Sequence, residues 1–105
     1  MPSITGAGRT RSGQGWQKYE AGGGIYLDVD TSSAGFSASF GTPVYVLSLG
    51  GNGTHWTVTG SSAVYSPTHS GFRVYLKRIE RAAPLTVEEA QEWGFHVNWV
   101  GVQNF

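Results

Sequence analysis

Two carboxylates one residue apart form the first group in this chain whose type and spacing suggest chemistry. Asp28 and Asp30 flank Val29, so in an extended segment both side chains point to the same side. Paired carboxylates can hydrolyse a glycosidic bond or hold calcium. Hydrolysis, however, needs a defined separation of the two groups in a cleft, and calcium needs many more oxygen ligands. We therefore expect both side chains to lie on an exposed strand edge.

The other reactive side chains form no catalytic or metal-binding pattern. His55, His69 and His96 fall in different segments without metal-ligand spacing, and the chain has no cysteine to supplement them. No segment resembles a nucleophile elbow or another arranged triad. The glycines at 6, 8 and 22–24 do not stand between a strand and a helix, as a dinucleotide fingerprint requires. We expect no catalytic residues, no metal and no cofactor, and hence a protein that is not an enzyme.

Tryptophans are the candidates for binding a neutral sugar, because an aromatic ring can cover the C–H face of the sugar while polar groups fix its hydroxyls. The chain has four, Trp16, Trp56, Trp93 and Trp99. Trp99 lies among apolar residues in a predicted strand, and we expect it in the core. Trp56 follows a turn and Trp93 ends a predicted helical insert, so these two have the best prospect of partial exposure.

Composition narrows the class of protein. With 105 residues the chain has the size of one domain, and the lack of cysteine excludes a disulfide framework. Seven basic and seven acidic residues cancel, which argues against a nucleic-acid partner. No stretch is apolar and long enough to insert into a membrane, and residues 1–15 lack the apolar core of a signal peptide. We expect a cytoplasmic or particle-associated (virion) protein, extracellular only if exported by another route.

Sixteen glycines, frequent serine and threonine and many aromatic residues are typical of an all-β protein with many turns. We predict a glycine-rich N-terminal arm over 1–24, with at most one short strand, followed by an antiparallel six-stranded β-sandwich over 25–105. Alternating apolar residues place the strands at 25–30, 35–40, 43–49, 56–66 (bent at Gly60), 70–76 and 95–102.

A short helical insert is expected before the last strand. Thr86 and Glu89 have the spacing of a capping box, in which each side chain bonds the backbone N–H of the other residue. Val87, Ala90 and Trp93 lie at i, i+3 and i+6, enough for about two turns that lean on the sandwich.

Two predicted strands are apolar on both faces. The strand at 43–49 alternates valines on one side with larger apolar residues on the other, and the strand at 95–102 places Val100 and Val102 opposite Trp99. A domain of this size has few elements to cover both faces, and soluble monomers rarely leave large apolar patches exposed. The sequence therefore predicts a sandwich that packs against copies of itself.

Three motifs stand in a fixed order along the chain. They are Pro43-Val44-Tyr45-Val46-Leu47-Ser48-Leu49, then Ser70-Gly71-Phe72-Arg73-Val74-Tyr75-Leu76, then Phe95-His96-Val97-Asn98-Trp99-Val100-Gly101-Val102. This order resembles the H-type lectins, the family of snail agglutinins and of the trailing domain of discoidin-like proteins. The resemblance extends to Arg9-Thr10-Arg11-Ser12-Gly13 with Trp16 and to Gln103-Asn104-Phe105, and so covers roughly the whole chain. It implies a compact antiparallel sandwich that forms a homotrimer and binds sugar between two protomers.

Only some positions of the family's sugar site have a counterpart in this chain. Gly24 or the preceding Gly23 occupies the position of a glycine that the family follows with an acidic residue, which is missing here. Thr59 falls at or near the position of an arginine, and Trp93 takes that of a tyrosine. The family's Trp-His pair is absent after Phe72, where the chain has Lys77-Arg78-Ile79-Glu80-Arg81 instead.

These substitutions suggest a modified site where the insert 77–93 meets the arm of a neighbouring protomer. There Trp93 would supply the apolar platform, and Arg78, Glu80 or Arg81 would bond the sugar hydroxyls. Trp56 is the other tryptophan that could contact a glycan.

The sequence thus favours non-catalytic carbohydrate binding by a homotrimeric, lectin-like domain whose partner is a glycan. The alternative is a structural or adhesive trimer, such as the tip domain of a phage fibre or spike, that serves assembly or host attachment. The missing sugar-gripping residues and the glycine-rich arm favour that alternative. The two functions overlap if a spike binds a host glycan.

Overall fold

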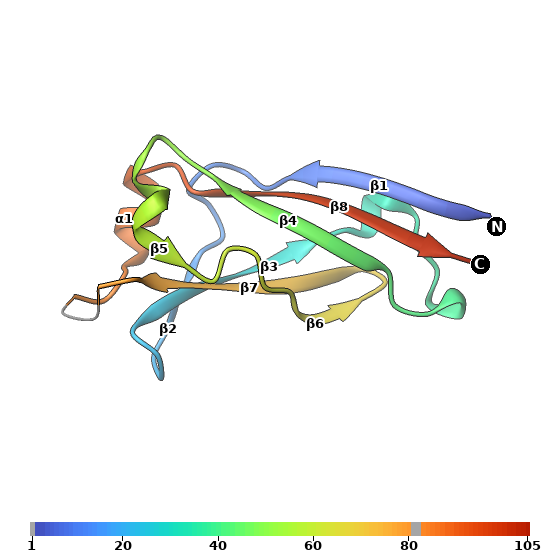
Figure 1. The fold of residues 1–105 in the computed structure, drawn as a ribbon, viewed down its shortest axis with the longest axis horizontal. Helices are drawn as coiled ribbons and strands as arrows, with labels where there is room; N and C mark the ends of the chain where they lie inside the picture. The colour runs from blue at the N-terminus through green and yellow to red at the C-terminus, as the bar shows by residue number, and fades with distance from the viewer. Residues whose placement is uncertain (1, 81–82) are drawn as a thin grey trace.

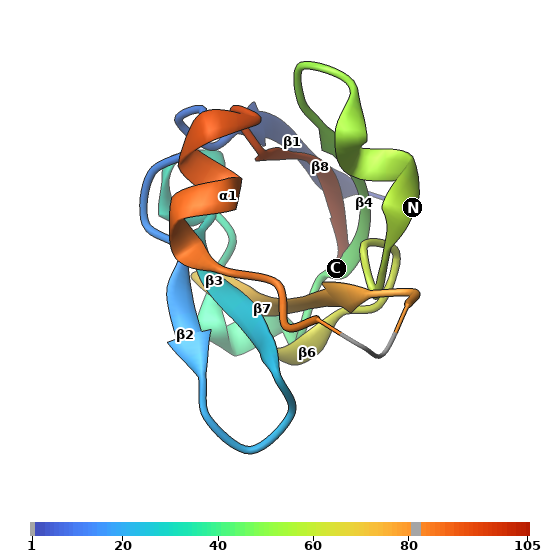
Figure 2. The same ribbon diagram turned by 90° about the vertical axis from the view of Figure 1, so that its left-hand side faces the viewer.

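The computed structural model describes residues 2–80 and 83–105, which form two antiparallel β-sheets and a short helix (Figure 1). One sheet has the strand order β1-β8-β4, with β1 (Ser3–Arg9), β8 (His96–Asn104) and β4 (Val44–Gly50). The other has the order β2-β3-β7-β5, with β2 (Gln17–Tyr19), β3 (Gly24–Asp30), β7 (Gly71–Arg78) and β5 (Val58–Thr59), and β6 (Tyr65–Thr68) also pairs with β7. The sheets face each other, with the helix α1 (Val87–Glu92) at one side (Figure 2). The predicted all-β, sandwich-like architecture is confirmed.

The core lies between the two sheets because the strands alternate apolar and polar residues. The buried side chains of β3 and β7 are Ile25, Leu27, Val29, Phe72, Val74 and Leu76. Those of the facing sheet include Tyr45, Leu47, Val97 and Trp99. Trp99 is only 6% exposed, which confirms its expected place in the core. Since one face of every long strand is fixed inward, the residues between these positions must point outward.

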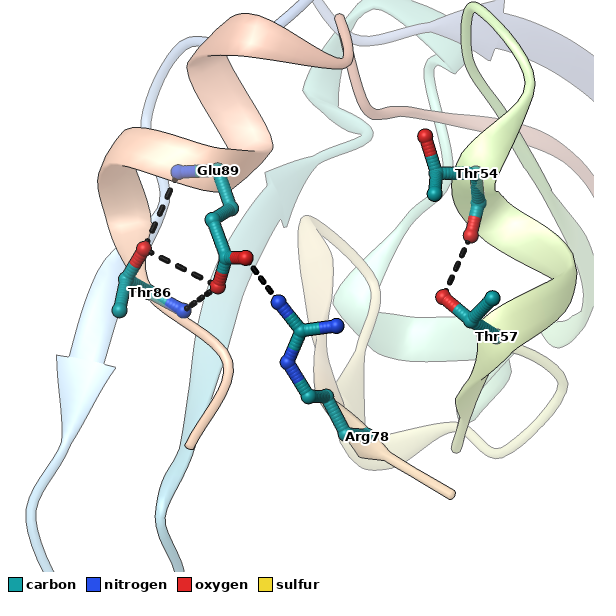
Figure 3. Close-up of polar contacts among 5 residues, drawn as sticks. All are labelled: Thr54, Thr57, Arg78, Thr86 and Glu89. Atoms are coloured by element: carbon teal, nitrogen blue, oxygen red, sulfur yellow. Dashed lines mark hydrogen bonds and ion pairs between the residues drawn. The ribbon is translucent and has the colours of Figure 1, made fainter. Parts of the chain in front are cut away.

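The helix α1 begins as the sequence predicts. The Thr86 hydroxyl accepts a hydrogen bond from the Glu89 backbone N–H at 3.1 Å, and the Glu89 carboxylate accepts one from the Thr86 N–H at 3.1 Å (Figure 3). Ala90 is fully buried, and Val87 and Trp93 pack against the core at its edge. The capping box and the apolar face of the insert are therefore confirmed.

The segment expected to be an arm contributes two strands to the sheets. β1 pairs with β8 over seven residues, from Ser3 with Asn104 to Arg9 with Asn98, and β2 pairs with β3. Packing requires glycine at positions 6 and 8, because neighbouring side chains occupy the space that a Cβ atom would need. A Cβ at Gly8 would lie 2.8 Å from Nε1 of Trp99, and one at Gly6 would collide with the side chain of Ala34. The prediction of an arm with at most one short strand is therefore wrong, because the segment contains β1 and β2. Its glycines serve to make room for core side chains.

The prediction of a strand at 35–40 is wrong. This part of the chain follows a turn of 3-10 helix (Ser32–Ala34) and forms a second one (Ala38–Phe40). The Ser37 hydroxyl accepts from the Ser39 N–H at 3.2 Å, and the Gln103 side-chain amide bonds the Ser37 N–H and the carbonyls of Ser37 and Gly41. These bonds satisfy the backbone locally, so a strand partner is not needed.

The segment predicted as one strand at 56–66 is divided into three elements. It begins in a 3-10 turn (Thr54–Thr57), which the Thr57 hydroxyl closes by donating to the Thr54 carbonyl at 2.7 Å (Figure 3). β5 and β6 follow, and Gly60 between them has φ of 102°, a conformation that favours glycine. The bend at Gly60 is therefore confirmed, but the described residues contain eight strands rather than six.

The outer faces of the two sheets differ in character. On the β1-β8-β4 sheet, Val44 and Val46 are 66% and 62% exposed, and Val100 lies beside Val46 in the register with 38% exposure. The outer face of the other sheet is occupied by tyrosines and charged residues.

No described helix has the length and apolar character needed to cross a membrane.

Candidate ligand-binding site

Four tyrosines cluster on the outer face of the β2-β3-β7-β5 sheet. Tyr26 and Tyr75 stand directly opposite each other on β3 and β7, and their buried neighbours in sequence fix them outward. Tyr19 from β2 and Tyr65 from β6 flank the Tyr75 ring edge-on, with centroid distances of 5.0 Å and 4.8 Å. Edge-on contacts of this kind hold rings in place while leaving part of their faces accessible.

A hollow of about 530 Å³ opens beside these rings. Its lining consists of Tyr19, Gly22, Gly24, Thr59, Gly60, Tyr65, Tyr75, Leu76 and Lys77. Gly24 pairs with Tyr19 and lies against Lys77, so a side chain is missing between them. A Cβ at Gly24 would collide with the Leu76 carbonyl oxygen. The sheet backbone thus forms the floor, while tyrosine rings, a threonine hydroxyl and an ammonium group form the rim.

An ion pair stiffens the end of the cluster away from Lys77. Arg73 binds both carboxylate oxygens of Asp28, through Nε at 2.6 Å and through its second terminal nitrogen at 2.9 Å. Its guanidinium lies 4.2 Å from the centroid of the Tyr26 ring, and it donates to the Tyr75 hydroxyl at 3.4 Å. Arg73 therefore ties β3 to β7 and fixes two of the tyrosines.

The pair Asp28 and Asp30 is not arranged for acid–base catalysis. The hydrogen bonds from Arg73 lower the pKa of Asp28, and those from Ser32 lower the pKa of Asp30. Both groups are therefore ionised at neutral pH, with no carboxyl held protonated to act as an acid. Both side chains are exposed, as expected from the sequence, but β3 lies between β2 and β7 in the sheet order and is not an edge strand.

The structure separates the predicted site residues into three groups. Gly24 and Thr59 line the tyrosine hollow. Arg78 and Glu80 line an adjoining hollow of about 510 Å³, together with Gly22, Gly23, Lys77, Ala83 and Pro84. Trp56 is 79% exposed on the 3-10 turn before β5 and lines neither hollow. Arg81 lies outside the described residues.

Trp93 and Arg78 are engaged in holding the insert. Arg78 forms an ion pair with Glu89 of α1 (Figure 3). Its guanidinium also lies 5.4 Å from the centroid of the Trp93 ring. Trp93 is half-buried and packs on Phe95, with ring centroids 5.7 Å apart. Trp93 does not line either hollow, so within one chain it supports the insert and does not form a platform beside the tyrosines.

The sequence predictions do not include the tyrosines, Arg73 or Lys77 as site residues, because they rest on tryptophan as the ring that covers a sugar and on the positions of a family resemblance. A signal was present in the sequence: Tyr26 and Asp28 alternate with buried residues of one strand, and Arg73 and Tyr75 alternate with those of another. Two antiparallel strands with such faces place the four side chains together. The sequence did not reveal which strands are neighbours.

Within the described residues, no group of three or more histidine and acidic side chains is placed to hold a metal ion. No protein-family model matches the chain, and no curated protein matches it in sequence. The tyrosine hollow and the exposed apolar surfaces are therefore the features that bear on function.

Proposed function

We propose that this protein binds saccharides without catalysis, as a homotrimeric domain that resembles the H-type lectins. The observation that carries the proposal is the tyrosine hollow on the outer face of the β2-β3-β7-β5 sheet. A sugar has apolar C–H faces and polar edges, and it needs a ring to cover the former and hydrogen-bond partners for the latter. Tyrosine supplies both features in one side chain.

The hollow offers suitable partners for a pyranose. Tyr65 is 47% exposed and Tyr19 is 39% exposed, so both rings have free surface to cover a sugar face. The Thr59 hydroxyl can donate and accept, and the glycines of the floor let a ligand approach the backbone. The rings are already held by Tyr75, which limits the entropy lost on binding.

The second part of the proposal is the trimer. Val44, Val46 and Val100 form an exposed aliphatic surface on the outer face of the β1-β8-β4 sheet, opposite in the fold to the tyrosines. Packing of this surface against two further copies would remove it from water and leave the tyrosine hollows outside. Three sites on one particle raise the effective concentration of a weak ligand.

A structural or adhesive trimer remains the second candidate function. It is favoured by the stack of Phe40 on Phe105, whose rings lie 4.6 Å apart and are both 46% exposed at the end of the molecule that holds the chain termini (Figure 1). This pair is a further exposed apolar feature in addition to the valines. An assembly partner, such as the shaft of a phage fibre or spike, would cover such a surface.

A glycan array separates the two functions, with Tyr65→Ala as the test variant and Trp56→Ala as its control. Both changes remove a largely exposed aromatic ring, but only Tyr65 lines the hollow. We expect Tyr65→Ala to weaken binding about tenfold per site, the effect of losing about 1.4 kcal/mol of contact. Trp56→Ala should bind as the parent does.

The melting temperature and oligomeric state of both variants should match those of the parent, so that a loss of binding reports on the hollow. Equal binding by Tyr65→Ala and the parent would remove the hollow as the sugar site. A parent that binds no saccharide on the array would favour the structural trimer.

A further inference from the structure

Lys77 is the charged residue among those that line the tyrosine hollow. It lies two positions after Tyr75 on β7, so both side chains point to the outer face, and it pairs with Thr59 across β5. Lys77 is exposed and borders the adjoining hollow as well. A ligand that covers the tyrosines therefore reaches the Lys77 ammonium.

The carboxylates around the hollow are mostly bound to other cations. Asp28 is held by Arg73, Glu89 by Arg78, and Glu20 lies 3.7 Å from the Lys18 ammonium. Among the described residues, Lys77 has no carboxylate within ion-pair distance. Glu80 borders only the adjoining hollow. The tyrosine hollow thus presents one uncompensated positive charge to its ligand.

The geometry points to an acidic saccharide as the ligand, one that carries a carboxylate or a sulfate on the ring covered by the tyrosines. This inference rests on the proposed function and narrows its substrate class. An ammonium group has three donors and no acceptor, so it binds an anion better than a sugar hydroxyl. Thr59, directly opposite Lys77, can donate a further hydrogen bond to the same anion.

The test compares saccharides that differ only in the anionic group. Methyl glucuronide and methyl glucoside, and galactose 6-sulfate and galactose, are titrated into the isotope-labelled protein, and amide chemical shifts give a dissociation constant per site. We expect the acidic member of at least one pair to bind about fivefold more tightly, as for a partly exposed charge pair. The carboxylate and sulfate pairs distinguish the two sources of charge.

Lys77→Met removes the ammonium and keeps most of the side chain. It should abolish the preference, so that the acidic and neutral members of a pair bind with equal affinity. Lys18→Met is the matched control, because Lys18 is a nearby exposed lysine outside the hollow whose charge is offset by Glu20. This variant should retain the preference.

Ionic strength gives a second readout that does not depend on a variant. Raising the salt concentration from about 0.05 M to about 0.5 M should reduce the preference of the parent, because exposed charges are screened. Equal binding of acidic and neutral members by the parent would overturn the inference while preserving saccharide binding. A preference that survives in Lys77→Met would also overturn it. Absence of binding by all four probes, together with a negative array, would overturn the proposed function itself.

Discussion

At the scale of single residues, Arg73 combines polar and aromatic contacts within the tyrosine cluster. It binds Asp28 through two nitrogens, covers the Tyr26 ring and donates to the Tyr75 hydroxyl. The hydrogen bonds that Arg73 donates to Asp28 raise the pKa of Arg73 further above its ordinary value, so its charge is constant at all accessible pH values. The response of this cluster to acidic pH therefore comes from Asp28.

We predict that Arg73→Met raises the pKa of Asp28, because the hydrogen bonds and the positive charge that lower it are lost. A carboxylate with a lowered pKa stabilises the fold above its unfolded-state pKa of about 3.9 and loses that contribution as the pH falls through its folded-state value. The stability difference between parent and variant should therefore shrink on acidification below about pH 4. Carboxyl chemical shifts during a pH titration measure the pKa directly.

Asp30 provides the internal control for this titration. Its pKa is lowered by Ser32, not by Arg73, so it should be the same in parent and variant. If the Asp28 pKa is unchanged in Arg73→Met, the ion pair does not form in solution and the rings of Tyr26 and Tyr75 lack this support.

At the scale of elements, the strands that could be predicted are those with strict alternation. β3, β4, β7 and β8 begin and end within two residues of the predicted ranges, and β7 and β8 each extend two residues further at the C-terminal end. β1 could not be predicted, since its inward positions Gly6 and Gly8 carry no apolar side chain to reveal a buried face. A glycine that admits a neighbouring ring looks the same in sequence as a glycine in a flexible linker.

The candidate site, too, could be predicted from the sequence only in part. Gly24 and Thr59 were identified through a resemblance, and they do line the hollow. Tyr65 and Tyr75 were not identified, because they come together only through the pairing of β6 with β7, which is irregular and follows a broken segment. The contacts between neighbouring strands, more than the residue types, decide which side chains form the site.

We predict that Gly8→Val destabilises the protein by about 1–3 kcal/mol, since the new side chain would overlap the Trp99 ring in the core. Ala7→Val is the matched control: Ala7 is the neighbouring position on β1 and faces outward, so its larger side chain does not enter the core between the sheets. Denaturant unfolding of both variants measures the difference. Equal stability of the two would mean that β1 does not pack on β8 as described.

At the scale of the whole molecule, the two outer faces suggest a division of roles. The valine surface of the β1-β8-β4 sheet is suited to contact other copies, and the tyrosine surface of the second sheet is suited to contact a ligand. Because they belong to different sheets, burial of one leaves the other accessible. This arrangement allows several ligand sites to face outward from one assembly.

We predict a particle mass of about three times the 11.3 kDa chain mass by light scattering. Val46→Asp should convert it to a monomer, because a carboxylate on the valine surface would be buried without a partner. Ile79→Asp serves as the control, since Ile79 is 63% exposed but directly follows β7 and does not belong to the valine surface. A parent that scatters as a monomer at micromolar concentration would contradict the trimer.

The pairing of the first and last strands also determines how the fold responds to mechanical force. The Phe105 N–H donates to the Pro2 carbonyl at 3.0 Å, and the antiparallel register continues from Ser3 opposite Asn104. Both ends of the chain therefore lie side by side at one end of the molecule (Figure 1). Tension that pulls these ends apart would load the β1–β8 hydrogen bonds one after another, as in unzipping, and not all together in shear. The sheet should consequently open at low force from this end, while the tyrosine hollow on the other sheet stays intact until β1 has separated.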